Sequence, residues 1–268
     1  KMPFSFVCTR CTRKHVSDMS TLECVDCSAP LQISYCEGPE SASIVFHGRR
    51  APLPIRDPRS LISLGEGHTP CVPLDALASK LQMSSLLAKL EYASPTGSFK
   101  DRGSAVLVSA AKENDVAELV EDSSGNAGAS LAAYAARASI RAHIFAPESA
   151  PSAKIDQIRA YGAILHLVPG SRDAAANAAK AFAGKNKLVY ASHTMSPYYL
   201  EGTKMFAYDL LGQLEKTPPA HIIFPVGNGS LLPALQDAFF VHLTLCVAHQ
   251  HILKLCGKWR TLPAMSMI

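Results

Sequence analysis

Between residues 118 and 192, short apolar runs alternate with longer runs whose apolar positions recur at helical spacing. The predicted strands are 118–121, 142–147, 164–170 and 188–192, and the predicted helices are 129–139, 152–162 and 173–185. Strands that alternate with helices of this length indicate βαβ units and a parallel sheet. Ligands bind at the carboxyl ends of the strands in such sheets, so the turns that follow the strands are the first places to examine for function.

The pattern extends on both sides of this region. Residues 103–112 and 200–214 are predicted to be helical, and residues 221–239 repeat the order of strand, glycine turn and helix, with the strand at 221–224. Residues 241–268 contain no Asp or Glu but three of the ten His, and they do not continue the rhythm. We interpret them as a truncated or frame-altered end in preference to a poorly patterned terminal segment.

Composition narrows the class of protein. With 268 residues, 48% hydrophobic and 18% charged, the chain has the balance of a soluble globular protein with one or two domains and a small module. The net charge of +4 is not gathered into a dense basic run, which argues against a nucleic-acid partner. No apolar run reaches the roughly 18 residues of a membrane span, and the N-terminus lacks the apolar core of a signal peptide. We therefore expect a cytoplasmic protein with no membrane partner.

Four of the eight cysteines form two C-x-x-C pairs, Cys8 with Cys11 and Cys24 with Cys27. Two such pairs can place four thiolates tetrahedrally around Zn²⁺, in a site that is structural because the protein fills every position. The alternatives are two reduced thiol pairs or a redox motif. Because a redox C-x-x-C is expected beside a βαβ pattern, which residues 1–36 lack, zinc is the favoured interpretation.

The stretch SPTGSFKDRGS, residues 94–104, places a single lysine among small and hydroxyl residues just before a predicted helix. A lysine forms a Schiff base only when its amine loses its proton, which burial or a nearby cation promotes. Here Arg102 lies close to Lys100 in the sequence, and Phe99 could exclude water. The simpler interpretation is an exposed lysine at a helix N-terminus with Asp101 as an ordinary capping acid.

Two glycine-rich turns accompany the lysine motif. The first is SSGNAGAS at residues 123–130, where glycines allow close approach of a ligand to the backbone and Asn126 can donate a hydrogen bond. The second is PVGNGSLL at residues 225–232, where backbone N–H groups at a helix start could bind a phosphate. Either turn taken alone is weak evidence for a site.

In this order, the three motifs resemble those of the fold-type-II pyridoxal-phosphate (PLP) enzymes, the tryptophan synthase β-like group, and among them the threonine synthase family. The resemblance runs from about Ser63 to Phe240 and includes residues 65–70 and 200–211. It implies an α/β fold with two doubly wound open-sheet domains, the large one truncated, beside the small N-terminal zinc ribbon. The implied division is a ribbon at 1–36, the large domain at 37–95 and 191–240, a small α/β domain at 96–190, and an atypical segment at 241–268.

The resemblance also implies roles for individual residues. Lys100 would hold PLP as a Schiff base and then move protons, and Asn126 would donate a hydrogen bond to the phenolic oxygen of the cofactor ring. The cofactor phosphate would be bound by Gly227, Asn228, Gly229, Ser230 and Leu231. The residues proposed to contact substrate are Thr96, Ser98, Ser123, Ser124 and Gln157.

The implied activity is that of a carbon–oxygen lyase, which converts O-phospho-L-homoserine and water to L-threonine and phosphate. The partner would be a small amino-acid substrate, and the chain would be a monomer or homodimer. Two alternatives stay open. One is another fold-type-II activity, either a threonine or serine dehydratase or a β-replacement enzyme. The other is an inactive fragment.

Overall fold

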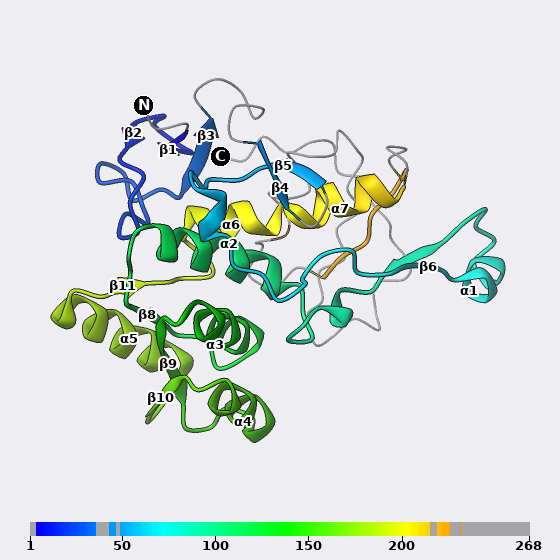
Figure 1. Ribbon diagram of the computed structural model, residues 1–268. Coiled ribbons are helices and arrows are strands. Elements are labelled where there is room, and N and C mark those ends of the chain that lie inside the picture. Colours follow the sequence, from blue (N-terminus) through cyan, green and yellow to red (C-terminus); the bar gives the residue numbers. More distant parts are fainter. Residues whose placement is uncertain (1–3, 36–42, 47–48, 215–218, 226–230, 232–268) are drawn as a thin grey trace.

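The computed structural model describes residues 4–35, 43–46, 49–214, 219–225 and 231 (Figure 1). At its centre is a parallel sheet of β8 (Glu118–Glu121), β9 (Arg141–Pro147), β10 (Ile164–Val168) and β11 (Val189–Tyr190), in the order β10-β9-β8-β11. All four predicted strands are confirmed, although the last is shorter than expected. The chain runs outward from β8 to β10 and then returns to the other side of β8, so the order reverses between β8 and β11.

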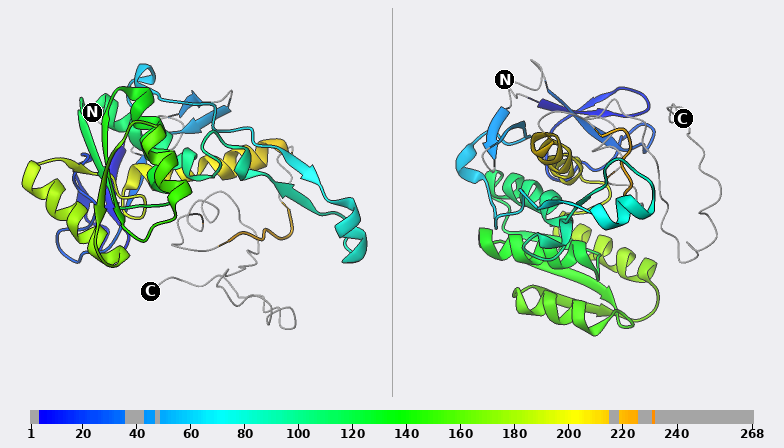
Figure 2. Two further views of the ribbon diagram at one scale, coloured as in Figure 1. Left: turned by 90° about the horizontal axis from the view of Figure 1, so that it is seen from below. Right: turned by 90° about the vertical axis from the view of Figure 1, so that its right-hand side faces the viewer.

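Helices cover both faces of this sheet. The connections are α3 (Asn126–Ala138), α4 (Ser152–Ala160) and α5 (Arg172–Asn186), which confirm the three predicted helices. In Figures 1 and 2, α3 and α4 lie on one face and α5 lies on the other. On α5 the buried residues Ala175, Ala179 and Ala183 recur every four positions, which gives the helix a narrow apolar stripe toward the sheet. The sheet is therefore doubly wound.

Two further helices meet between the parallel sheet and the N-terminal part of the chain (Figure 1). Helix α2 (Lys100–Glu113) packs most extensively against α6 (Pro197–Thr203). The contact depends on glycine: a Cβ at Gly202 would lie 2.5 Å from the carbonyl oxygen of Arg102, and one at Gly103 would lie 2.6 Å from the ring of Tyr199. The two backbones can approach this closely only because neither position carries a side chain.

The single helix expected at 200–214 is wrong, because the structure divides it into α6 and α7 (Met205–Gln213) at Lys204. The hydroxyl of Thr203 donates to the carbonyl oxygen of Leu200 at 2.6 Å, and the amide of Lys204 donates to that of Glu201 at 3.1 Å. Side-chain bonds of this kind compete with regular helical bonding and help to explain the division.

The strand expected at 221–224 is also wrong. Ile222 and Phe224 are buried while Ile223 is exposed, so the side chains alternate as in a strand, but no strand forms. A strand needs a hydrogen-bonded neighbour, and no described segment pairs with these residues. The helix predicted after the following turn lies outside the described residues.

The remaining strands form small antiparallel units. β1 (Phe4–Cys8), β2 (Lys14–His15) and β3 (Leu31–Tyr35) make a three-stranded sheet. β4 (Ser43–Phe46) pairs with β5 (Arg49–Pro52), and β6 (Cys71–Pro73) pairs with β7 (Leu87–Lys89). The second doubly wound domain is thus not formed by the described residues, because each of these ribbons pairs only within itself.

Short elements complete the described chain. α1 (Asp75–Lys80) joins β6 to β7 on an arm that projects from the body (Figure 1), and the 3₁₀ turns η2 (Pro58–Ser60) and η3 (Glu91–Ala93) lie in the connections. The N-terminal sheet is not a separate body. Phe6 meets the ring of Tyr198 edge-on at 5.3 Å, and Tyr35 donates to Glu201 at 3.0 Å, so both contacts are made to α6. Among the helices of the described ranges, none is long and apolar enough to cross a membrane.

The glycine contact between α2 and α6 yields the first prediction. Gly202→Ala should destabilise the fold by about 1–3 kcal/mol, because the methyl group would press against the backbone of α2. Gly184→Ala is the matched control: its Cβ would meet nothing within 4 Å on the exposed side of α5, so it should stabilise by up to about 1 kcal/mol. Urea unfolding of both variants measures the difference, and equal midpoints would contradict the close-contact explanation.

Candidate active site

Lys100 is the first residue of α2, and the turn before it is held by side chains of the same motif. The amide of Lys100 donates to the hydroxyl oxygen of Ser98 at 3.4 Å. Asp101 accepts from the amide of Thr96 at 2.7 Å and also from the hydroxyl of Thr96. Gly97 has φ +84°, a left-handed conformation that favours glycine. The small and hydroxyl residues of the motif therefore shape the loop that presents the lysine.

The pKa of Lys100 is lowered to about 8, mainly because the amine is buried; the carboxylate of Glu121 opposes this change and the positive charge of Arg172 adds to it. The amine lies 4.5 Å from the centre of the Phe99 ring. At neutral pH a larger fraction of this amine is unprotonated than for an ordinary lysine, as a nucleophilic lysine requires. Glu121 ends β8 and Arg172 begins α5, so both charged residues lie at the carboxyl edge of the sheet.

The turn SSGNAG follows β8 and opens α3. Ser123 is buried, and its hydroxyl oxygen accepts the amide of Gly125 at 3.3 Å, while Asn126 is exposed at the first position of the helix. A Cβ at Gly128 would lie 1.9 Å from the carbonyl oxygen of Ser123, so only glycine allows this turn. A Cβ at Gly125 would meet nothing closer than the Ser123 hydroxyl oxygen at 3.9 Å.

The other predicted site residues have different surroundings. Gln157 on α4 donates to the carbonyl oxygen of Thr96 at 3.2 Å, which ties the lysine loop to α4. Ser124 is partly exposed at the turn before α3. Gly227, Asn228, Gly229 and Ser230 lie outside the described residues. Leu231 is described, and it belongs to the same buried cluster against which Phe99 packs, so the end of the predicted phosphate loop lies near the lysine motif.

Behind the site is a buried ionic network that motif analysis did not find. Arg102, 2% exposed, donates to both carboxylate oxygens of Glu91 at 2.8 and 2.9 Å and to Asp209 at 2.9 Å. It also donates to the hydroxyl of Thr69 at 3.1 Å, and Lys89 donates to Asp209 at 2.6 Å. The sequence suggested that Arg102 acts as a cation near Lys100. The structure instead directs its guanidinium to Glu91 and Asp209, so Arg102 holds these segments together.

Sequence reasoning also missed a second buried pair. Glu121, at the end of β8, meets Nδ1 of His193 at 2.8 Å, and both side chains are almost fully buried. Burial raises the pKa of Glu121, while the neighbouring His193 opposes this rise. The one signal in the sequence was an acidic pair at the end of an apolar strand, just before the glycine turn.

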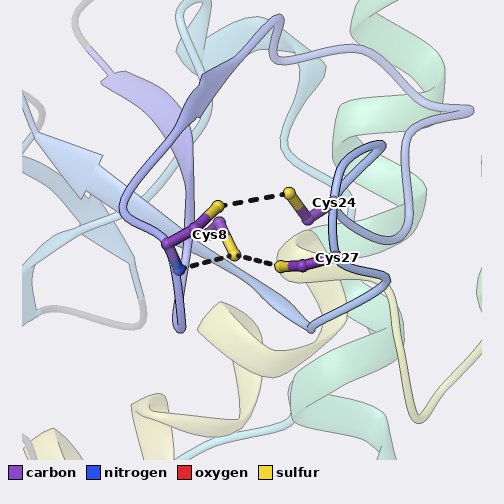
Figure 3. A group of neighbouring side chains, drawn as sticks. Cys8, Cys24 and Cys27 are labelled. Carbon is purple, nitrogen blue, oxygen red and sulfur yellow. Dashed lines mark hydrogen bonds between the residues drawn. The ribbon is translucent and has the colours of Figure 1, made fainter.

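The four cysteines of the C-x-x-C pairs converge at the end of β1 (Figure 3). Their sulfur atoms all lie within 4.8 Å of one another, with 3.5 Å between Cys8 and Cys27 and between Cys11 and Cys24. Tetrahedral zinc with Zn–S bonds of about 2.3 Å separates its sulfurs by about 3.8 Å, so the four thiols fit that ion.

The two cysteine pairs lie in turns with the same backbone hydrogen bond. The amide of Thr12 donates to the carbonyl of Cys8 at 3.1 Å, and that of Ser28 donates to Cys24 at 2.8 Å. Thr12 and Ser28 both have positive φ. Burial raises the pKa of the Cys8 thiol, but the amides of Cys11 and Arg10 outweigh it and lower the pKa to about 6. The pKa of the Cys11 thiol is raised to about 12, in part by its bonds to the Cys8 and Cys24 thiols, so in the absence of metal the thiolate form is favoured at Cys8 alone of these two.

Comparisons with known proteins identify the family of the chain. The family model described as pyridoxal-phosphate dependent enzyme matches residues 62–239. Threonine synthase of Methanocaldococcus jannaschii is 39% identical over 188 residues, which are 70% of this chain and 46% of that protein. Threonine synthase of Bacillus sp. strain ULM1 is 36% identical over the same share of this chain and 53% of its own length. The chain thus spans about half the length of these curated relatives.

Solved structures show the same fold at lower identity. Diaminopropionate ammonia lyase from Escherichia coli, in its apo form, superposes with a TM-score of 0.63 at 18% identity, covering 70% of this chain and 62% of the other. This likeness supports the α/β architecture alone. The family model covers all three glycine and lysine motifs from which the site was inferred.

The buried network behind Lys100 yields a second prediction. Asp209→Asn should destabilise the fold by about 3–5 kcal/mol, because it removes the negative charge that Arg102 and Lys89 share. Asp156→Asn, which alters an exposed pair with Arg159, should leave stability nearly unchanged. Chemical denaturation of the two variants at neutral pH measures the contrast.

The same variant has a defined pH dependence. Burial raises the pKa of Asp209, but bonds and charges from Lys89 and Arg102 outweigh it, and the pKa lies below its ordinary 3.8. Its stabilisation is therefore complete above pH of about 4 and is lost as pH falls through the lower native value. The difference between wild type and Asp209→Asn should shrink below that pH, and a constant difference would contradict the assignment.

Proposed function

The chain belongs to the family of pyridoxal-phosphate-dependent enzymes, and on this premise we propose that Lys100 binds PLP covalently as part of a threonine synthase-like lyase site. The observation that carries the proposal is the position of Lys100. It opens α2 in a turn held by its own motif, with its pKa lowered to about 8 by burial and influenced by charges at the carboxyl edge of the sheet. The neutral amine would bond to the aldehyde carbon of the cofactor with release of one water.

Bound PLP supplies an electron sink that stabilises carbanions of amino-acid substrates. In this proposal Lys100 both holds the cofactor and moves protons at the substrate carbons. Asn126, exposed at the start of α3, donates to the phenolic oxygen of the ring. The phosphate is bound by the loop Gly227, Asn228, Gly229, Ser230 and Leu231, whose last residue packs in the cluster that contacts Phe99.

Substrate contact is proposed for the hydroxyl groups of the two loops. Ser123 and Ser124 precede α3, where backbone amides and a helix N-terminus favour a carboxylate or phosphate. Ser98 lies in the lysine loop. Thr96 and Gln157, which already bond to Asp101 and to the Thr96 carbonyl, would act by shaping that loop around the substrate.

For the reaction, we propose conversion of O-phospho-L-homoserine and water to L-threonine and phosphate. The support is that the curated relatives named above are threonine synthases and share the motif region. The second candidate is another amino-acid activity of the family, because the solved structures of the same fold include ammonia lyases and threonine deaminase. Release of phosphate from O-phospho-L-homoserine supports the first, and formation of an oxo acid from threonine supports the second.

We further propose the domain division given by the motifs, with the small domain at 96–190 between two parts of the large one. We also propose a structural Zn²⁺ on Cys8, Cys11, Cys24 and Cys27. Such a site would stabilise the N-terminal sheet where it contacts α6 through Tyr198.

The PLP proposal predicts a linkage at one lysine. Incubation of the chain with PLP and then borohydride should leave a stable adduct on Lys100, found by peptide mass spectrometry and by long-wavelength absorbance before reduction. Lys100→Ala should abolish it, whereas Lys112→Ala, at the exposed end of the same helix, should not. Because only the neutral amine reacts, the rate of linkage should rise with pH and reach half its maximum near the pKa of about 8. An adduct spread over surface lysines, with none on Lys100, would contradict the proposal.

The zinc proposal predicts one bound ion per chain. Native mass spectrometry of protein prepared with zinc should show that mass. A chelator should remove it and lower the thermal midpoint, because metal binding is coupled to folding of its ligands. Cys24→Ser should weaken the site, while Cys71→Ser, on β6 outside the cluster, should not. A thermal midpoint unchanged by metal removal would overturn the structural role.

A further inference from the structure

Strand β8 carries two buried or half-buried Glu–His pairs, one at each end. At its start, Glu118 meets Nε2 of His143 at 2.8 Å, with a quarter of the Glu118 side chain exposed. At its end, Glu121 meets Nδ1 of His193 at 2.8 Å, with the Glu121 side chain only 1% exposed. A carboxylate at that depth costs free energy unless it is partnered, so the second pair needs an explanation.

The location of the second pair supplies part of that explanation. The order of the sheet reverses between β8 and β11, and Glu121 ends the first of these strands while His193 follows the second. Ligands of open α/β sheets bind outside the carboxyl ends of the strands at this reversal. The pair therefore lies where the fold places its site, directly before the Ser123 turn.

A chain of contacts joins this pair to the lysine. The ring of His193 meets that of Tyr199 edge-on, with 6.1 Å between centroids, and the hydroxyl of Tyr199 donates to the carbonyl oxygen of Lys100 at 3.3 Å. The Tyr199 ring fills the space above Gly103, on the first turn of α2, where a Cβ would lie 2.6 Å away. Movement of His193 or Tyr199 would thus be transmitted to the turn that carries Lys100.

We propose that Glu121, His193 and Tyr199 are positioning residues that hold the first turn of α2 and the amine of Lys100 in place at the carboxyl edge of the sheet. The inference rests on the proposed role of Lys100 and deepens it. Tyr199 sets where the backbone of Lys100 lies. Glu121, partnered by His193, supplies a negative charge that offsets the effect of burial on the lysine.

The balance of charge at Lys100 follows from the groups around it. Glu121 on β8 raises the pKa of the lysine, while Arg172 at the start of α5 and burial of the amine lower it. Phe99 contributes its ring, and the side chains that interact electrostatically with Glu121 itself include His193, Asp122, Tyr190 and Tyr199. With Glu121 ionised, the lysine can still take up a proton after giving one away, which a group that shuttles protons requires.

Competitive acetylation of the cofactor-free full chain tests the charge effect. Trace acetic anhydride labels lysines in proportion to their neutral fraction, and mass spectrometry across a pH series gives the pKa of Lys100. Glu121→Gln should lower that pKa and raise the neutral fraction at pH 7 by a factor of about three or more. Glu118→Gln is the matched control, since it alters the other Glu–His pair on the same strand, and it should leave Lys100 unchanged.

Hydrogen exchange tests the positional effect and does not depend on Glu121 being replaceable. Tyr199→Phe removes only the hydroxyl that donates to Lys100, so amide exchange in peptides covering residues 99–104 should become several-fold faster. Tyr198→Phe is the matched control, because the neighbouring hydroxyl donates to the carbonyl oxygen of Ser17 at 3.4 Å instead. This control should affect the N-terminal sheet and leave the first turn of α2 unchanged.

These measurements separate the inference from the proposed function, because neither uses PLP. Equal Lys100 pKa values in wild type and a folded Glu121→Gln would overturn the charge role. Equal exchange at residues 99–104 in Tyr199→Phe and Tyr198→Phe would overturn the positional role. If Lys100 does not bind PLP but the pKa change in Glu121→Gln and the faster exchange in Tyr199→Phe are both observed, the proposed function is wrong and the positioning of the lysine is supported.

Discussion

The guanidinium of Arg102 is the interaction on which the described structure most depends. It lies in the first turn of α2 and bonds to Glu91 after β7, to Asp209 on α7 and to Thr69 before β6. These segments lie far apart in the sequence, and a buried arginine loses a large hydration energy unless every contact is made. The turn that presents Lys100 can therefore take its position only when the surrounding segments are assembled.

Helix α6 connects the N-terminal sheet to helix α2 through two adjacent tyrosines. Tyr198 packs on Phe4 and Phe6 of the N-terminal sheet, and Tyr199 packs on the first turn of α2. Gly202, on the same helix, allows the backbone of α2 to come into direct contact. The cysteine cluster and the lysine loop are thus supported by one short helix, although the two motifs lie more than sixty residues apart in the chain.

The chemistry proposed for Lys100 results from opposing effects, of which burial is the larger. Burial lowers the pKa of the amine, and the charge at the end of β8 restrains this change, which leaves a value of about 8. A lysine with this pKa can act as a nucleophile and also carry a proton at neutral pH. Asp101 serves a different purpose nearby, because its carboxylate accepts from Thr96 and fixes the shape of the loop.

The sequence by itself determined the central sheet, the three helices that connect its strands, and the lysine and glycine motifs. These features depend on local periodicity and on short motifs, which can be read without knowledge of the fold. The alternative of an exposed lysine with Asp101 as a capping acid is wrong, because Lys100 is half-buried and the carboxylate of Asp101 accepts from Thr96 and does not cap α2. The cysteine spacing likewise indicated a cluster that the structure brings together.

Only the tertiary structure decided which side chains meet. Arg102 with Asp209, and Glu121 with His193, are separated by 107 and 72 positions, and no local pattern identifies such partners. Residues 221–224 show the side-chain alternation of a strand, but no segment in the described ranges pairs with them, and strand formation requires a neighbour as well as alternating side chains. The division of α6 from α7 depended on how Thr203 bonds to the backbone. Pairing across distant segments is a property of the assembled chain, and it decided both the surroundings of Lys100 and the contacts that hold it.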